Sequence, residues 1–185
     1  DCGQDRLVPV ACKGRGFCPS CCGRRMVERA AHLVDNVLPH VPIRQWVLSL
    51  PFQLRWRLAF DHELCRAIHA VFARAIEGFY RKRAKKAGHP DGRTGCVTVI
   101  QRYGGALNVN VHFHSLVPDG TFHEQADGTL RFHAQKPPTD AQVHALLETI
   151  VQRIVRLLQR RGLWEPGEEH PDLSAGMQSP ALGDL

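Results

Sequence analysis

The chain has 185 residues, of which 43% are hydrophobic, and this is enough for one ordinary core with a small appendage. No apolar run approaches the ~20 residues that span a bilayer, and the N-terminus lacks the apolar segment of a signal peptide, so we expect a cytoplasmic protein without a membrane anchor. The formal net charge of +6 indicates an anionic partner, and nucleic acid is the class we expect.

Residues 1–25 form a Cys-, Gly- and Arg-rich segment without periodic apolar residues. Four of its cysteines have the spacing C-x9-C-x5-C-x2-C: Cys2, Cys12, Cys18 and Cys21. Thiolates favour zinc, and a structural zinc would explain how a segment with so little core folds. Free reduced cysteines, or a redox dithiol at Cys18 and Cys21, are the alternatives. Because the chain begins at Asp1, we also expect a fragment with a zinc ligand missing upstream.

Helix and strand patterns alternate over the next sixty residues. The pattern predicts a short helix over 26–38 and a strand over 43–50 that Pro51 ends. From His62 to Ala87, apolar residues recur at helical spacing, and Asp61 is suited to cap this helix.

The second half of the chain begins with β patterns. Strands are predicted over 96–103 and 107–117, joined by a turn at Gly104 and Gly105 into an antiparallel hairpin, and residues 122–134 predict a second hairpin. A helix over 140–161 follows, with Thr139 as its cap and a face bearing Arg153, Arg156 and Arg160 that we expect to be solvated. After Gly162 the composition predicts a loosely ordered tail.

The strand over 107–117 carries the most informative pattern. Strand alternation places the apolar side chains Leu107, Val109, Val111 and Phe113 on one face and the polar side chains Asn108, Asn110, His112 and His114 on the other. Two imidazoles two residues apart on a rigid strand converge on one point, as a divalent metal site requires. A polar strand facing solvent without a metal is the alternative.

Basic residues gather at two places in the sequence. As DNA contacts we expect Lys13, Arg15, Arg24, Arg25, Arg81, Lys82, Arg83, Lys85 and Lys86. The run from 81 to 86 ends a predicted helix, where cations also suit the helix dipole, so a solvated helix end is an equal alternative.

Several other residues receive a structural interpretation. We expect buried thiols at Cys65 and Cys96, and core packing, in preference to base stacking, for Phe52, Trp46 and Trp56. We expect His123 and His133 to face solvent.

Three strings in residues 1–135 resemble one family. The strings ACKGRGFCPSCCGRRM, VPIRQWVLSLP and TVIQRYGGALNVNVHFHSLVPDG are similar to the rolling-circle transposases of the insertion sequence ninety-one group, which are two-tyrosine HUH endonucleases. The resemblance implies an incomplete zinc-binding segment at 1–25, an HUH core at 26–162 that lacks its C-terminal tyrosine helix, and a tail at 163–185. The fold class is therefore α+β, with an antiparallel sheet and helices packed on one face.

The resemblance also implies a chemistry. In such enzymes two histidines, matching His112 and His114, hold Mg²⁺ or Mn²⁺ against the scissile phosphate of single-stranded or hairpin transposon-end DNA. A tyrosine then attacks, which leaves a 5′-phosphotyrosine link and a free 3′ hydroxyl. For the third ligand the candidates are Gln101, Asn110 and Asp119.

The sequence departs from this family pattern at the nucleophile. No tyrosine follows His114, and neither Tyr80 nor Tyr103 matches the position of the family's nucleophile, so we expect both to be structural or to contact DNA. The fragment is then expected to keep the metal site and to be inactive. A DNA-binding remnant without catalysis, or a metal-dependent phosphodiesterase that uses water, are the alternative functions.

Overall fold

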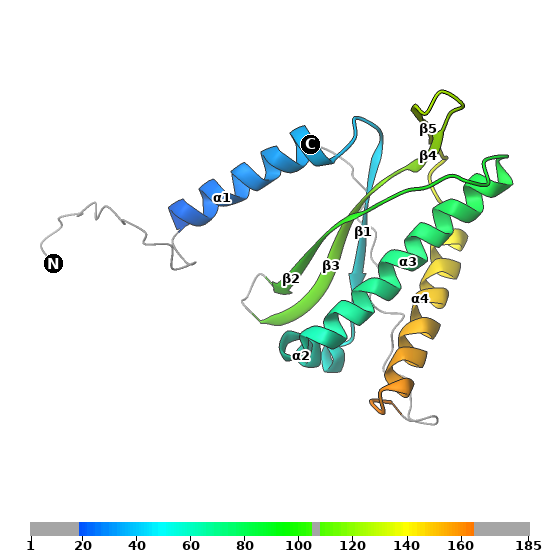
Figure 1. Cartoon of the computed structure of the whole chain (residues 1–185). Helices are drawn as coiled ribbons and strands as arrows, with labels where there is room; N and C mark the ends of the chain where they lie inside the picture. The colour runs from blue at the N-terminus through cyan, green and yellow to red at the C-terminus, as the bar shows by residue number, and fades with distance from the viewer. Residues whose placement is uncertain (1–18, 105–107, 165–185) are drawn as a thin grey trace, which may run out of the picture. The chain divides into compact units, whose positions relative to one another are not determined.

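The structure is a computed structural model that describes residues 19–104 and 108–164, with side chains from Gly23 onward (Figure 1). The chain divides into two compact units, Asp1–His40 and Val41–Leu185. The predicted tail at 163–185 lies outside the described residues except for Leu163 and Trp164. Among the described helices, none is both long and apolar enough to cross a membrane.

The first unit contains a single described helical rod. Helix α1 (Pro19–His32) continues directly into the π-helical turn η1 (Leu33–Val37), where the Leu38 N–H donates to the Leu33 carbonyl at 2.7 Å. The helix therefore begins at Pro19 and not at Met26 as the sequence predicted. Proline is favoured in a first helical turn because its missing N–H would be unpaired there, but without apolar periodicity the cysteine-rich stretch gave no other helical signal.

The second unit is built on a three-stranded antiparallel sheet. Its strands are β1 (Ile43–Ser49), β2 (Val97–Tyr103) and β3 (Val109–Pro118), in the order β1-β3-β2. The long strand β3 is therefore central and is paired along both edges. A separate two-stranded sheet follows, formed by β4 (Gly120–Glu124) and β5 (Leu130–Ala134). The predicted strands and hairpins are confirmed, with boundaries shifted by one or two residues.

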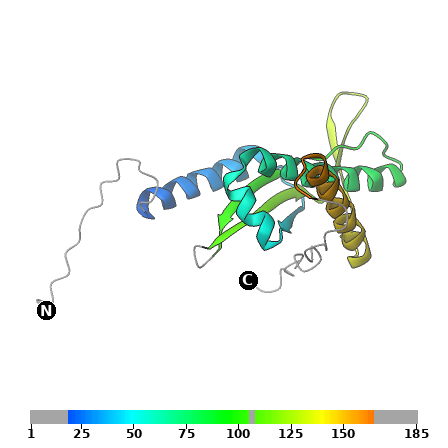
Figure 2. The ribbon, with the colours of Figure 1, turned by 90° about the horizontal axis from the view of Figure 1, so that it is seen from below.

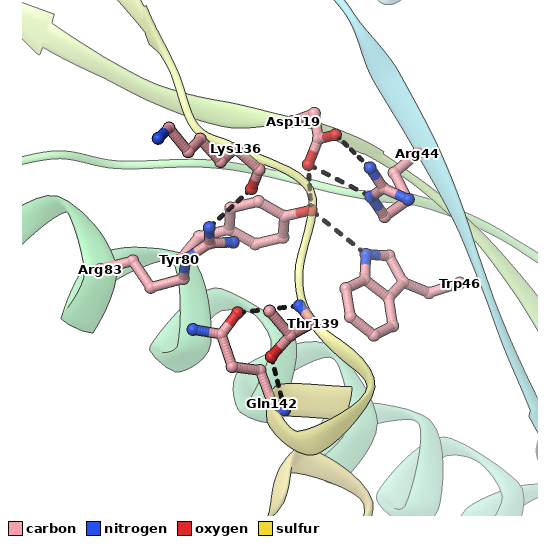
Figure 3. Close-up of polar contacts among 8 residues, drawn as sticks. All are labelled: Arg44, Trp46, Tyr80, Arg83, Asp119, Lys136, Thr139 and Gln142. Atoms are coloured by element: carbon pink, nitrogen blue, oxygen red, sulfur yellow. Dashed lines mark hydrogen bonds and ion pairs between the residues drawn. The ribbon is translucent and has the colours of Figure 1, made fainter. Parts of the chain in front are cut away.

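Three helices complete this unit: α2 (Phe52–Phe60), α3 (His62–Lys86) and α4 (Asp140–Arg160). The predicted caps are present. The Asp61 carboxylate accepts from the Leu64 N–H at 2.8 Å, and Thr139 with Gln142 forms a reciprocal capping box (Figure 3). Helix α2 was not predicted, because it is only 9 residues long and buries only Leu54 and Leu58, too few positions for a clear period.

The helices pack on one face of the three-stranded sheet (Figures 1 and 2). The face of β3 that carries Val111, Phe113 and Val117 is fully buried in a core that it shares with α3 residues such as Ile68 and Phe72. Truncating a phenylalanine in such a core costs about 3–5 kcal/mol, so this packing fixes which face of β3 stays open. The predicted α+β class, with helices on one face of an antiparallel sheet, is confirmed.

Candidate functional site

The open face of β3 carries the two histidines that the alternation predicted. His112 and His114 are half-buried, and their ring centroids lie 4.8 Å apart with the ring planes inclined by 61°. His112 is paired across the sheet with Ser49 of β1 and Gln101 of β2, which places it at the centre of the sheet. Both rings therefore stand on a strand that is held on both sides.

Each ring is oriented through its Nδ1 atom. His112 Nδ1 lies 2.6 Å from the Asn110 carbonyl oxygen, which can only accept, so Nδ1 carries the hydrogen and Nε2 keeps its lone pair. His114 Nδ1 lies 2.5 Å from the side-chain amide nitrogen, Nε2, of Gln45 on β1, which donates to it in this orientation. If the Gln45 amide is rotated by 180°, its oxygen accepts from an Nδ1–H instead and holds His114 in the same tautomer as His112.

Two buried polar atoms on this face have no hydrogen-bond partner among the described residues: His114 Nε2 and Asn110 Oδ1. Such orphaned groups are costly, and a ligand that binds them is an ordinary explanation. Burial, and to a lesser degree the neighbouring His112, lowers the pKa of His114 and favours the neutral ring that can bind a metal. The residues present thus fit a divalent cation held by two imidazoles and an amide oxygen.

The three candidates for a third ligand fare differently. Asn110 shares the strand face with both histidines, and its side-chain oxygen has no hydrogen-bond partner among the described residues. Gln101 is the cross-strand neighbour of His112, and its amide nitrogen donates to the Tyr103 carbonyl at 3.1 Å. Asp119 is no longer a candidate, because its carboxylate is bound by Arg44 and Tyr80.

Asp119 is the centre of a buried polar network (Figure 3). Arg44 donates to both of its carboxylate oxygens, at 2.6 and 3.3 Å, and the Tyr80 hydroxyl donates to Oδ1 at 2.9 Å. The Trp46 indole N–H in turn donates to the Tyr80 oxygen at 3.4 Å. The network ties β1, α3 and the β3–β4 turn together.

The same network decides the role of Tyr80. Its side chain is 0% exposed, and burial raises the pKa of its hydroxyl far above the usual value. A hydroxyl that is buried, protonated and bound to a carboxylate cannot reach a phosphate, so Tyr80 is structural. Tyr103, by contrast, is exposed on β2.

The basic residues of α3 do not surround the histidines. On α3, Arg81, Lys82, Lys85 and Lys86 are exposed along a groove of about 960 Å³ between α3 and α4, in the helical layer that covers the opposite face of the sheet. Arg83 is held in the fold, because it donates to the Lys136 carbonyl at 2.6 Å (Figure 3). Its guanidinium carbon also lies 5.1 Å from the Phe79 ring centroid. We therefore assign Arg83 to packing in preference to DNA contact.

The predicted sites of the first unit are described only in part. Arg24 and Arg25 are exposed on α1. Five other predicted residues lie outside the described residues: Cys2, Cys12, Lys13, Arg15 and Cys18. The backbone of Cys21 lies in the first turn of α1.

Helix α2 exposes an aromatic stripe that was not anticipated. Phe52, Trp56 and Phe60 are 69%, 55% and 69% exposed, at a spacing of four residues, and the Trp56 and Phe60 ring centroids lie 5.2 Å apart. The expectation of core packing is thus wrong for Phe52 and Trp56, because α2 turns its leucines inward, and right for Trp46, which is 5% exposed. The helix begins three residues after Ser49, the partner of His112.

Two more expectations need correction. Cys65 is buried as predicted, but Cys96 is exposed at the start of β2. His123 is only 8% exposed, although it was expected to face solvent, because the loop after α3 packs over β4 and covers it. No local pattern signals this, since the covering residues lie some thirty positions earlier.

Two family models match the chain. The family described as "Transposase zinc-binding domain" matches residues 1–50, and the family described as "Putative transposase" matches residues 95–178. Neither a curated protein nor a solved structure matched. The first match covers the cysteine segment and supports a structural zinc there, and the second covers β2, β3 and both histidines.

Proposed function

Because this chain belongs to the transposases of the insertion sequence ninety-one group, we propose that it binds single-stranded transposon-end DNA and holds a divalent metal ion at His112 and His114 for strand nicking. The family membership implies an interaction with DNA. The single-stranded substrate and the metal-dependent step are proposals that rest on the geometry of β3 and α2.

The observation that carries the metal site is the pair of adjacent imidazoles on the open face of β3, where His114 Nε2 has no hydrogen-bond partner among the described residues. The Asn110 carbonyl fixes the His112 ring, Gln45 contacts the His114 ring, and the Asn110 side-chain oxygen also lacks a partner in the described part of the chain. A bound Mg²⁺ or Mn²⁺ would polarise a phosphoryl oxygen and stabilise the charge that develops during strand cleavage. The protein's own contribution is to present the ligands without having to reorganise them.

The aromatic stripe of α2 supports a single-stranded substrate. Exposed aromatic rings stack on unpaired bases, at about 1–3 kcal/mol per base, whereas the bases of a duplex are already stacked on one another. Phe52 opens this stripe close in sequence to Ser49, the β1 partner of His112, and the exposed Arg57 lies on the same helix. Because α2 contacts β3, a strand whose bases lie on α2 would run close to the strand that carries the histidines.

The exposed cations of α3 support binding to a longer stretch of DNA. Arg81, Lys82, Lys85 and Lys86 lie in the helical layer, away from the histidine face, so they would neutralise phosphates that flank the cleavage site. Their contribution should fall as salt rises, because it depends on counterion release.

The attacking hydroxyl is a separate question. The Tyr80 hydroxyl is buried against Asp119, and no tyrosine follows His114 in these 185 residues. We therefore propose that this chain supplies DNA binding and the metal site but not the nucleophile. A water molecule at the histidine site is the second candidate, since the open face of β3 is accessible and a metal-activated water needs no tyrosine.

The deciding experiment combines Mn²⁺ binding with a cleavage assay on a labelled mixed-sequence oligonucleotide. We expect the chain to bind the single strand in preference to the duplex and to form no covalent adduct with Mn²⁺ present. The double substitution His112→Ala with His114→Ala should abolish Mn²⁺ binding at this site, and His144→Gln on the exposed face of α4 is the matched control.

Each alternative has its own signature in that assay. Free cleaved strand that disappears in the double variant would identify water as the nucleophile. A covalent adduct that disappears in Tyr103→Phe would assign the attack to Tyr103 and overturn the proposal that the nucleophile lies elsewhere. Unchanged Mn²⁺ binding in the double variant would remove the metal site itself.

A further inference from the structure

A second group of three histidines lies at the two-stranded sheet of β4 and β5. His89 follows α3, His123 lies on β4 and His133 lies on β5. Their ring centroids are 3.9 to 4.7 Å apart, and one nitrogen from each ring lies within 4.8 Å of the other two. His123 and His133 belong to one hairpin, whereas His89 lies some thirty residues earlier and only the fold brings it to them.

We propose that His89, His123 and His133 form a second metal site, which binds Zn²⁺ through three imidazole nitrogens with a fourth position open to solvent. Zinc–nitrogen bonds of ~2.0–2.1 Å in tetrahedral geometry place ligand nitrogens roughly 3.4 Å apart, so small ring rotations suffice to close the observed group. Imidazole ligands favour zinc and related ions, whereas Mg²⁺ and Mn²⁺ prefer oxygen. Its three nitrogen ligands therefore favour zinc, whereas the proposed site on β3 adds an amide oxygen to its two imidazoles.

The backbone around His89 holds it in place. The His89 N–H donates to the Ala84 carbonyl at 2.9 Å, after Gly88 has turned the chain with a φ of +88°, a conformation that side chains disfavour. Arg93 then pairs with Phe122 of β4 through two backbone hydrogen bonds of 2.7 and 3.0 Å. The loop is thus fastened at both ends beside the hairpin (Figure 1).

His123 is fitted closely into its surroundings. Its Nε2 lies 3.1 Å from the hydroxyl of the fully buried Thr121, which can hold one ring nitrogen and leave the other free. Gly92 packs directly against the ring, since a Cβ there would lie 2.6 Å from Cε1 and 2.8 Å from Nε2 of His123. A glycine at 92 therefore lets the loop seat His89 against His123.

The charge state and access also suit a metal. Burial, then the nearby His89 and His133, lowers the pKa of His123, and burial lowers the pKa of His133, so both rings are readily neutral. The three histidines line a surface pocket of about 880 Å³, which gives an ion a route from solvent. Asp91 lines the same pocket, and its negative charge acts to raise the pKa of His123, against the stronger effect of burial.

A metal ion at this site would stabilise the fold. A two-stranded hairpin is marginal by itself in water, and among the described residues β4 and β5 form a sheet of two strands that only the isolated Arg93–Phe122 bridge extends. A zinc ion that links His89 to His123 and His133 would fasten the hairpin to the end of α3, because metal-binding free energy adds to folding free energy.

The test is a zinc titration of the full chain with its resident zinc in place, in the His112→Ala, His114→Ala background, so that the strand pair does not contribute. We expect one additional equivalent of Zn²⁺ to bind. His89→Gln and His133→Gln, both at half-buried positions, should each weaken that step by about 100-fold or more, which exceeds the effect of losing a group that only hydrogen-bonds to a ligand. His144→Gln should leave it unchanged.

The ring resonances of the histidines give a direct readout that does not depend on a variant folding. On zinc addition those of His89, His123 and His133 should shift together at one equivalent, while that of His144 stays in place. No additional equivalent, unchanged uptake in both glutamine variants, or ring shifts that spare these three residues would each overturn the proposal.

Discussion

The two histidine groups of this protein are built in opposite ways. His112 and His114 lie two residues apart on β3, the central strand of a three-stranded sheet whose other face is the main core. His89, His123 and His133 come from a loop and a two-stranded hairpin. The first group is rigid because the core holds its strand, whereas the second depends on a weak hairpin remaining docked.

This difference suggests two relations between metal and fold. On β3 the ligands exist before any ion arrives, which suits catalysis because no reorganisation is needed. At the hairpin, a bound ion would help to create the arrangement that binds it, which suits a structural role. The junction between the two groups is Asp119, which separates β3 from β4.

The largest expected effect comes from breaking that junction. Asp119→Ala leaves the half-buried Arg44 unpaired and removes the acceptor of the Tyr80 hydroxyl, so we expect a loss of about 2–4 kcal/mol in the free energy of unfolding, measured in urea. Glu63→Ala, which removes an exposed ion pair with Arg66, should cost no more than about 0.5 kcal/mol. Equal losses in the two variants would show that the junction is not structural.

The next prediction separates DNA binding near the β3 histidines from zinc binding at the hairpin. Trp56→Ala should weaken binding of a single-stranded oligonucleotide by about 1–3 kcal/mol, measured by fluorescence anisotropy, because it removes one stacking surface. Since Trp56 is exposed, the free energy of unfolding should change little, and zinc uptake at the hairpin should not change. Weaker DNA binding that only accompanies a lower stability would contradict a stacking role.

A smaller effect tests the orientation of the strand pair. Gln45→Leu removes the side chain that contacts His114 Nδ1, so Mn²⁺ affinity should fall by about 10-fold in a calorimetric titration. Gln45 is a positioning residue, and Gln45→Glu, which keeps an acceptor for Nδ1–H, should restore the affinity. If leucine and glutamate behave alike, Gln45 does not act through His114.

The smallest effect concerns a histidine that belongs to neither group. Burial lowers the pKa of His69 below 6.5, and its Nε2 has no hydrogen-bond partner among the described residues. The unfolded chain binds a proton at His69 more readily than the folded chain does. The free energy of unfolding is therefore unaffected by protonation of His69 above pH 6.5 and falls as the pH drops below that value.

His69→Leu should therefore stabilise the fold by about 1 kcal/mol, with a larger gain at pH 5.5 than at pH 7.5, measured by urea unfolding at each pH. His144→Gln, at an exposed position, serves as the control and should show no such difference. A gain that is the same at both pH values would mean that His69 is not protonated on unfolding.

Local patterns predicted much of this protein from the sequence. The alternation in β3 fixed both its buried face and its histidine face, and Asp61 and Thr139 marked two helix starts, because strand alternation and helix capping depend on residues within a few positions of one another. The length of α3 followed from its long apolar period in the same way.

Tertiary packing decided the rest. Helix α2 was not predicted, because three of its apolar residues are exposed. Cys96 was predicted to be buried and is exposed, whereas His123 was predicted to face solvent and is buried, and no residue near either of them in sequence indicates this. Asp119 was a candidate metal ligand from its sequence position, but Arg44 and Tyr80, 75 and 39 residues away, donate hydrogen bonds to its carboxylate oxygens in the structure.

The sequence by itself determined the family resemblance, the strand that carries His112 and His114, and the lack of a tyrosine between them and residue 185, since these are properties of residue order. Only the tertiary structure decided that Tyr80 is buried, that the α3 cations lie on the other side of the sheet, and that three scattered histidines meet. These depend on contacts between distant segments, which core packing selects and no local period encodes.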